Sequence, residues 1–189
     1  MEQIKDIPYF FNLSENRQII LETNIKEHSP DSKRRKLFDV CRTRWIERIK
    51  GMDVFDEFYI PIVHALEDMH YNIGKICNSD TSTKATIHLK VLTSFDFLAT
   101  FMILKHVFMM TLPVTTMLQS KTNDIMDGIH LIESLKLDAD SSRSSVQEIH
   151  DQWYKEALSL RIVVELQQSK STGLMCHFIT LHQSTSLDQ

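Results

Sequence analysis

The sequence contains few of the residues that break regular secondary structure. Only four glycines and four prolines occur in 189 residues. Sandwiches and barrels need turn residues between many short strands, so this scarcity argues against both. Hydrophobic residues make up 42% of the chain, which is enough to bury a core. The composition therefore predicts an all-α fold.

Cysteine and net charge are also low. The three cysteines, Cys41, Cys77 and Cys176, are odd in number and far apart, which disfavours the disulfide framework of a small secreted protein. We expect reduced thiols in an intracellular compartment. The formal net charge of −4 gives the whole chain no long-range attraction for a polyanion. Any contact with nucleic acid must therefore be local.

No stretch of the sequence has the pattern of a membrane span. The N-terminus is polar and lacks the apolar core of a signal peptide. The most apolar stretch, 95–114, is interrupted by Asp96, Lys105 and His106, and charges inside a bilayer are costly. We expect this stretch to be a buried helix at the centre of a soluble bundle, with no membrane partner.

Apolar residues recur at steps of three and four, which is the signature of amphipathic helices. The pattern predicts an antiparallel bundle of about five helices, with apolar positions over 19–25, 45–69, 87–107, 125–135 and 146–164. Pro61 should kink or restart the second helix, and Pro113 should close the third. From 169 the sequence is rich in Ser, Thr and Gln. We therefore expect one helical domain over 1–168 and an unstructured tail over 169–189.

The densest functional signal is a basic segment between Lys33 and Lys50. It contains eight basic residues against two acidic ones, in a chain that is acidic elsewhere: Lys33, Arg34, Arg35, Lys36, Arg42, Arg44, Arg48 and Lys50. Such a patch can neutralise phosphates. Its first four basic residues also resemble a nuclear import signal, although short basic runs are common by chance. The predicted location is the nucleus, or otherwise the cytoplasm.

Trp45 adds an aromatic plane to this segment. Together with Arg44 it could stack an unpaired base and hold its backbone, and Arg48 lies one helical turn further on the same side. The alternative is structural: Trp45 fills a core position in line with Ile49, and the arginines form a solvated face. Composition alone leaves both interpretations open.

Residues with the pattern of a catalytic or metal site are lacking. A metal-dependent nuclease needs carboxylates that converge on the metal ions. The candidate carboxylates are Asp53, Asp56, Glu57, Asp138 and Asp140. None follows a predicted strand that would hold it rigidly, and each has a simpler role as a helix cap or on a solvated helix face. A structural zinc site needs four ligands at recognisable spacings. The candidates are Cys176, His177 and His182, and no paired Cys-x-x-Cys accompanies them. The sequence predicts no cofactor, no metal and no small-molecule substrate.

The segment Cys41–Arg48, with the letters CRTRWIER, resembles a Cys-x-Thr-Arg-Trp-x-x-Arg stretch of the hAT family of DNA transposases. That family includes domesticated members of the zinc finger MYM-type and THAP-containing kinds. Tyr9–Gln18 is similar to the family segment before this motif, and 95–125 is similar to the segment after it. The resemblance is collinear over about residues 7 to 165, so it is more specific than the short motif alone.

The resemblance implies a part of a transposase without its catalytic centre. In this family an RNase H-like domain with three acidic residues is interrupted by a large helical insertion, and this chain looks like that insertion. The family's first two acids lie upstream of the segment matched by Tyr9–Gln18, and the third lies downstream of the last matched helix. Arg44 and Trp45 match the Arg-Trp pair whose tryptophan handles a flipped base at the transposon end. We therefore expect no enzymatic activity and a DNA contact at Arg42, Arg44, Trp45 and Arg48.

Three functional hypotheses follow from the sequence. The first is a non-catalytic hAT-derived module that binds DNA through the basic segment. The second is a helical module that binds a protein partner or itself through the apolar helix over 95–114. The third is a vestigial product without a selected function.

Overall fold

The computed structural model describes the backbone of residues 2–37, 45–72, 77–120 and 124–185, and the side chains of this part except those of residues 2, 3, 45 and 167–185. The described residues form eight α-helices and no strand. Their bounds are α1 Glu2–Asn12, α2 Glu15–His28, α3 Trp45–Glu57, α4 Tyr59–Tyr71, α5 Ser79–Leu92, α6 Phe95–Leu118, α7 Ile125–Ser144 and α8 Val146–Thr185. The helical class is confirmed.

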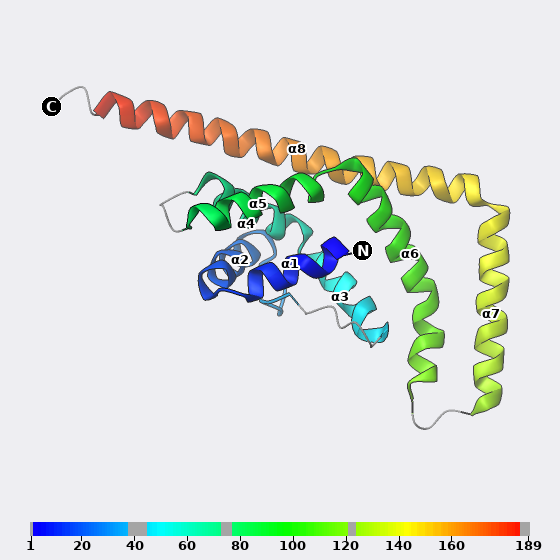
Figure 1. Ribbon diagram of the computed structural model, residues 1–189. Helices are drawn as coiled ribbons and strands as arrows, with labels where there is room; N and C mark the ends of the chain where they lie inside the picture. Colours follow the sequence, from blue (N-terminus) through cyan, green and yellow to red (C-terminus); the bar gives the residue numbers. More distant parts are fainter. Residues whose placement is uncertain (1, 38–44, 73–76, 121–123, 186–189) are drawn as a thin grey trace.

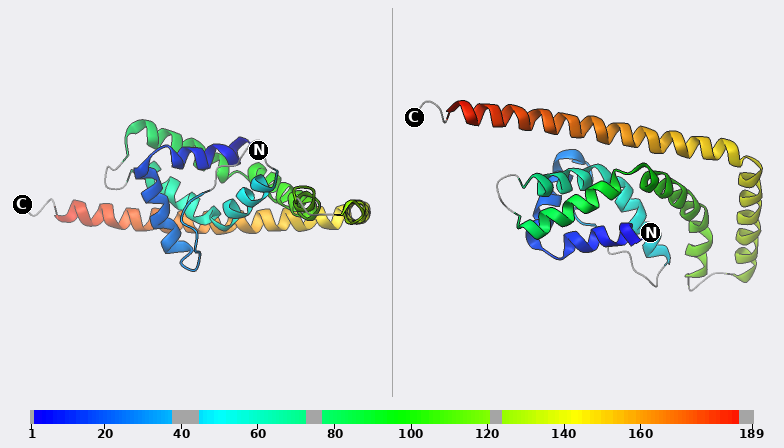
Figure 2. Two further views of the ribbon diagram at one scale, coloured as in Figure 1. Left: turned by 90° about the horizontal axis from the view of Figure 1, so that it is seen from below. Right: turned by 45° about the horizontal axis from the view of Figure 1, so that its top comes forward.

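The helices form two regions (Figures 1 and 2). Helices α1 to α5 make a compact body, in which α4 packs against α2 and α5. From this body α6 and α7 project as an antiparallel hairpin, which we call the arm. Helix α8 returns from the arm, packs on α6 and passes along the body (Figure 1). The predicted antiparallel bundle of about five helices is therefore wrong in its count and in its layout.

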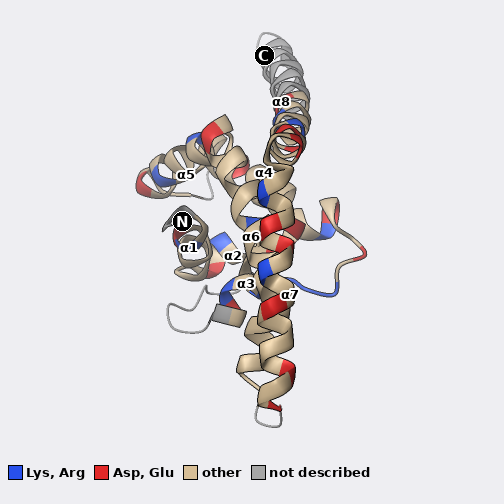
Figure 3. Cartoon of the chain, turned by 90° about the vertical axis from the view of Figure 1, so that its right-hand side faces the viewer, with Lys and Arg blue, Asp and Glu red and all other residues tan. Residues whose placement is uncertain are grey.

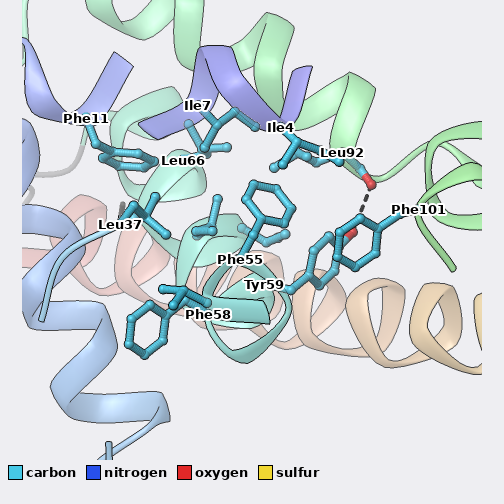
Figure 4. Close-up of a cluster of buried hydrophobic side chains, with 14 of the residues drawn as sticks. Ile4, Ile7, Phe11, Leu37, Phe55, Phe58, Tyr59, Leu66, Leu92 and Phe101 are labelled. Carbon is cyan, nitrogen blue, oxygen red and sulfur yellow. Dashed lines mark hydrogen bonds between the residues drawn. The ribbon is translucent and has the colours of Figure 1, made fainter. Parts of the chain in front are cut away.

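Most of the core lies in the body. Of the 25 buried hydrophobic residues in the described part of the chain, 20 precede residue 93, and α4 contributes Tyr59, Ile62, Val63, Ala65, Leu66 and Met69. Phe55 of α3, 1% exposed, packs its ring against those of Tyr59 and Phe101, with centroid distances of 6.5 and 5.5 Å (Figure 4). Buried aromatic side chains of this size dominate the energetics of a small core.

One buried hydrogen bond connects α4 to the end of α5. The Tyr59 hydroxyl donates to the Leu92 carbonyl oxygen at 2.8 Å, and both residues are at most 1% exposed (Figure 4). Burial raises the pKa of Tyr59 far above its ordinary value, so the phenol stays protonated and remains a donor. Because this bond satisfies a carbonyl at a helix end, it fixes where α5 stops.

Two of the predicted long helices are divided. The helix over 45–69 is two helices with a break at Phe58, which places Pro61 in the first turn of α4 and agrees with the predicted effect of Pro61. The predicted helix over 87–107 is divided at Thr93 and Ser94, and the Ser94 side chain accepts a hydrogen bond from the Phe97 amide at 3.3 Å. A serine N-cap of this kind starts a helix without glycine or proline.

Other boundaries also differ from those expected. Residues 7–12, which precede the five predicted helices, belong to helix α1, and residues 79–83 belong to α5, whose N-cap is Asn78. Pro113 lies inside α6 and does not close it. Residues 138–141, which fall between two of the predicted helices, lie inside α7. The backbone of α8 is helical through Thr185, where an unstructured tail was expected from 169.

Helix α6 is not at the centre of a bundle. Of its 24 residues only Leu98, Phe101 and Phe108 are buried. By length and composition, α6 alone among the described helices could cross a membrane. The expectation of a fully packed central helix is wrong because the far half of α6 extends beyond the body, where α7 is its main neighbour in the described part of the chain (Figure 1).

Candidate nucleic-acid interface

The basic segment begins in the loop that joins α2 to α3. Its first part, Ser29–Leu37, projects from the body and carries the four consecutive basic residues (Figure 3). Leu37 is 5% exposed, so it anchors the end of this loop in the core. The anchor holds the basic residues at the surface of the body, next to the last turns of α3, where Asp53 and Glu57 lie.

The four basic side chains of the loop are not equivalent. Lys33 and Lys36 are exposed. Arg34 donates from Nη1 to Glu57 Oε2 at 2.9 Å, and the same nitrogen lies 3.9 Å from Asp53 Oδ2. Arg35 folds back and donates to the carbonyl oxygens of Ser32 and Arg34 at 2.5 and 3.1 Å. Two lysines are thus presented to solvent, while the two arginines hold the loop.

The ion pairs of Arg34 are surface interactions. The Arg34 and Glu57 side chains are 47% and 34% exposed. Exposed pairs of this kind contribute about 0–1 kcal/mol because water and salt screen them. A phosphate group could therefore displace Glu57 from Arg34 at small cost.

The predicted base-handling residues lie at and before the start of α3. Trp45 is the first residue of that helix, but its side chain is not among the described ones. Arg42 and Arg44 lie entirely outside the described residues. The predicted Trp45–Arg44 stack therefore stays a prediction. Arg48 is described and is only partly exposed, and the next residue, Ile49, is 2% exposed. The first turns of α3 thus place Ile49 in the core, whereas the basic loop contacts the other end of this helix at Asp53 and Glu57.

The candidate carboxylates do not converge. Asp56 is paired with Lys105 of α6, whereas Asp53 and Glu57 lie beside Arg34. Asp138 and Asp140 are exposed within α7. Among the described residues, no group of three or more His, Cys, Asp or Glu side chains could hold a metal ion. The side chains of Cys176, His177 and His182 lie outside this described part.

A cluster of titratable side chains lies between α2 and α4, beside the basic loop. The helical spacing of the sequence did not predict it. The rings of His28 and His64 stack with centroids 4.1 Å apart, and His64 Nδ1 lies 3.2 Å from Glu67 Oε2. Nearby, Asn24 Nδ2 donates to Asp68 Oδ2 at 2.8 Å. These residues are 36 or more positions apart across the two helices, so only the packing of α2 on α4 brings them together.

The pKa values in this cluster follow from partial burial. Burial lowers the pKa of His28, and the neighbouring imidazole of His64 lowers it further. Burial raises the pKa of Asp68, against the opposing effect of the Asn24 hydrogen bond. His28 is the last residue of α2, so the cluster fixes the point from which the basic loop leaves the body.

Comparison with known proteins gives a limited similarity. No protein-family model matches the chain, and no solved structure matches it. The chain is 22% identical over 166 residues to the human (Homo sapiens) protein called 52 kDa repressor of the inhibitor of the protein kinase, covering 87% of this chain and 22% of that protein. The mouse (Mus musculus) protein of the same name is 22% identical over 174 residues, with the same coverage. The chain thus spans about a fifth of the length of the curated relatives it matches.

Proposed function

We propose that this chain is a non-catalytic helical module of a protein derived from a hAT transposase, and that it binds DNA through the basic segment. The similarity to the repressor proteins supports a domesticated, transposase-derived origin. The observation that carries the DNA contact is the loop that presents Lys33 and Lys36 to solvent beside the last turns of α3. Lysines at this spacing on a projecting loop suit contacts to phosphates.

The charges around the loop favour phosphate positioning over base reading in the described part. Lys33 and Lys36 are exposed. Arg34 forms an exposed ion pair with Glu57, and a phosphate group can take the place of the Glu57 carboxylate in this weak pair. Base contacts would come from Arg42, Arg44, Trp45 and Arg48, as the resemblance to the family motif implies. The four basic residues of the loop, Lys33, Arg34, Arg35 and Lys36, would also serve as the proposed nuclear import signal.

The non-catalytic part of the proposal is supported by the partners of the acidic residues. Asp56 and Glu57 are each paired with a basic side chain, so neither presents a free carboxylate pair to a metal ion. Incubation of the chain with Mg²⁺ and supercoiled plasmid is expected to leave the DNA uncut. Mg²⁺-dependent nicking that Asp56→Asn abolishes would contradict this part.

The DNA contact is tested by the salt dependence of binding. We expect Lys33→Ala/Lys36→Ala to weaken duplex binding about tenfold at low salt and to reduce the slope of log K against log salt by about 1.8, since each phosphate contact contributes about 0.9. Arg44→Ala/Trp45→Ala should weaken hairpin and single-stranded binding more than duplex binding, because stacking needs an unpaired base. Fluorescence anisotropy at several salt concentrations measures both.

The matched control is Lys84→Ala/Lys90→Ala on α5, which removes the same charge from two exposed lysines in another part of the body. This variant should keep the wild-type slope. Equal losses in the two double variants would mean that the chain attracts DNA through its overall charge, and the proposed interface would be wrong.

A second candidate function, binding of a protein partner through the arm, is favoured by the exposed apolar surface of α6 and α7. Helix α7 has 20 residues and none of them is buried. Isolated helices are marginal in water and gain most of their stability from packing. A helix this exposed suits a second protein surface.

A further inference from the structure

The basic loop begins with the only Ser-Pro or Thr-Pro pair of the sequence. Of the four prolines, Pro30 follows Ser29, whereas the other three follow isoleucine or leucine. Those three prolines lie inside α1, α4 and α6. Pro30 is exposed and lies directly after the end of α2. The hydroxyl that precedes a proline thus lies on a surface loop and not in a helix.

Ser29 begins a tight turn at the start of this loop. Its amide donates to the Ile25 carbonyl oxygen at 2.9 Å and ends α2, and its own carbonyl oxygen accepts from the Ser32 amide at 3.2 Å. Serine and proline are both favoured in the first two positions of such a turn. Ser29 is partly exposed, and the next two residues are exposed. An enzyme that binds this segment in an extended form therefore has one weak, accessible turn to open.

Pro30 determines the class of enzyme that could modify Ser29. Proline has no backbone N–H, so it can enter an apolar enzyme pocket that provides no hydrogen-bond acceptor at this position. Any other residue would lose there the hydrogen bond that its N–H makes with water. An enzyme with such a pocket selects hydroxyls that precede proline, which is the preference of proline-directed protein kinases.

The charges of the loop determine what a phosphate on Ser29 would do. A phosphate adds about −1.5 to −2 charge at pH 7, and the run Lys33–Lys36 carries four positive charges. Arg35 donates to the Ser32 carbonyl oxygen at 2.5 Å, so its guanidinium lies beside the turn. Arg34 is held by exposed ion pairs that a phosphate can replace. The dipole of α2 disfavours negative charge at the end of this helix, which favours a phosphate turned toward the loop cations.

We propose that Ser29 is a phosphorylation site for a proline-directed protein kinase, and that the phosphate neutralises the basic loop. The Ser29 oxygen attacks the γ-phosphorus of ATP on the kinase, the new O–P bond replaces the bond to the bridging oxygen, and ADP leaves. The hydroxyl proton passes to the catalytic aspartate of the kinase. The phosphate pairs with Arg34 and Arg35 and offsets the charge that Lys33 and Lys36 present to DNA. The site itself stands on the loop alone, whereas its effect on DNA rests on the proposed function.

The modification is measured by mass spectrometry of the 189-residue chain after incubation with ATP, Mg²⁺ and a purified proline-directed kinase. One mitogen-activated and one cyclin-dependent kinase are used in separate reactions. We expect one phosphate on Ser29 with at least one of them. Pro30→Ala should slow the transfer about tenfold or more, because alanine brings an N–H into the pocket.

The matched control is Ser32→Ala, which removes the other serine of the same turn. It should be phosphorylated on Ser29 at the wild-type rate, because Ser32 precedes a lysine and not a proline. Two results would contradict the assignment: no phosphate on Ser29 with either kinase, or a rate that Pro30→Ala does not change.

The pairing of the phosphate with the loop is measured by phosphorus NMR without DNA. Nearby guanidinium groups favour the dianion of a phosphate, so they lower its second pKa from the ordinary value of about 6. Arg34→Gln/Arg35→Gln should raise the midpoint of the phosphate titration by about 0.5 pH unit, the size expected of exposed ion pairs. Lys84→Ala/Lys90→Ala on α5 should leave the midpoint unchanged. An equal midpoint in the wild type and the arginine variant would overturn the proposed neutralisation.

The effect on DNA separates this inference from the proposed function. We expect duplex binding by the phosphorylated chain to be about tenfold weaker at low salt, as for Lys33→Ala/Lys36→Ala, because the phosphate offsets about two positive charges. If phosphorylation leaves the affinity unchanged while the lysine variant weakens it, the proposed regulation is wrong and the DNA contact stands. If the unmodified chain binds no DNA, the DNA contact and its regulation are both wrong, and the transfer and titration results decide the phosphorylation site.

Discussion

The body and the arm both consist of helices with apolar residues at helical spacing, but they bury very different amounts of surface. The body contains 20 of the 25 buried hydrophobic residues of the described chain, whereas α7 contains none. Leu66 in α4 is fully buried and Ile132 in α7 is half exposed. The difference shows that an apolar residue at helical spacing identifies a helix, but not whether that helix is covered by its own chain.

The largest expected effect compares one core residue with one arm residue. Phe55→Ala should lower the free energy of unfolding by about 3–5 kcal/mol, because it removes a buried ring and leaves a cavity among Tyr59, Phe97 and Phe101. At a concentration where the chain is monomeric, Ile132→Ala should change it by less than about 0.5 kcal/mol. Urea titration followed by circular dichroism measures both values. Equal losses would mean that the arm is as firmly packed as the body.

A smaller effect is expected at two helix N-caps, one in each region. Asn78 Oδ1 accepts a hydrogen bond from the Thr81 amide at 2.8 Å, and Asp124 Oδ1 accepts one from the Met126 amide at 3.1 Å. Asn78→Ala should cost about 1 kcal/mol of global stability. Asp124→Ala should speed amide hydrogen exchange in α7 while leaving global unfolding nearly unchanged, because an exposed helix opens locally. A global loss from Asp124→Ala as large as that from Asn78→Ala would contradict the division into body and arm.

The smallest effect expected is a dependence of body stability on pH. Burial lowers the pKa of His88, the Arg17 cation lowers it further, and Asp6 opposes both. Because the unfolded chain then binds the proton more readily, the stability of the folded state is present above pH 6.5 and is lost as the pH falls below it. His88 Nδ1 is buried without a hydrogen-bond partner in the described part, so His88→Leu should remove this contribution without removing a bond from that nitrogen.

The matched control for this pH effect is His130→Leu in the arm, where the histidine side chain is 69% exposed. Urea titrations at pH 7.5 and pH 5.5 should show a smaller decrease in stability for His88→Leu than for the wild type. His130→Leu should behave as the wild type does. A decrease in His88→Leu equal to that of the wild type would assign the pH dependence to another group.

Only part of the candidate interface could be predicted from the sequence. The basic run Lys33–Lys36 could be found from the letters alone, and it does lie on a surface loop. The sequence could not show which of the four side chains face solvent. Arg34 and Arg35 hold the loop, and this depends on Glu57 in the following helix and on local backbone carbonyls. The stacked pair of His28 and His64 had no signal in the sequence at all, since their contact depends on the packing of α2 on α4.

The sequence by itself determined that this protein is helical, because few residues break helices and apolar residues recur with the helical period. It also determined where positive charge concentrates. Only the tertiary structure decided the exact places where helices divide, since one break falls at Phe58, three residues before Pro61, and the other is set by the Ser94 N-cap. Tertiary structure also decided which apolar faces are covered. Periodicity gives each helix an apolar side, but the partner that covers it comes from elsewhere in the chain, and for the outer face of α7 the described chain provides none.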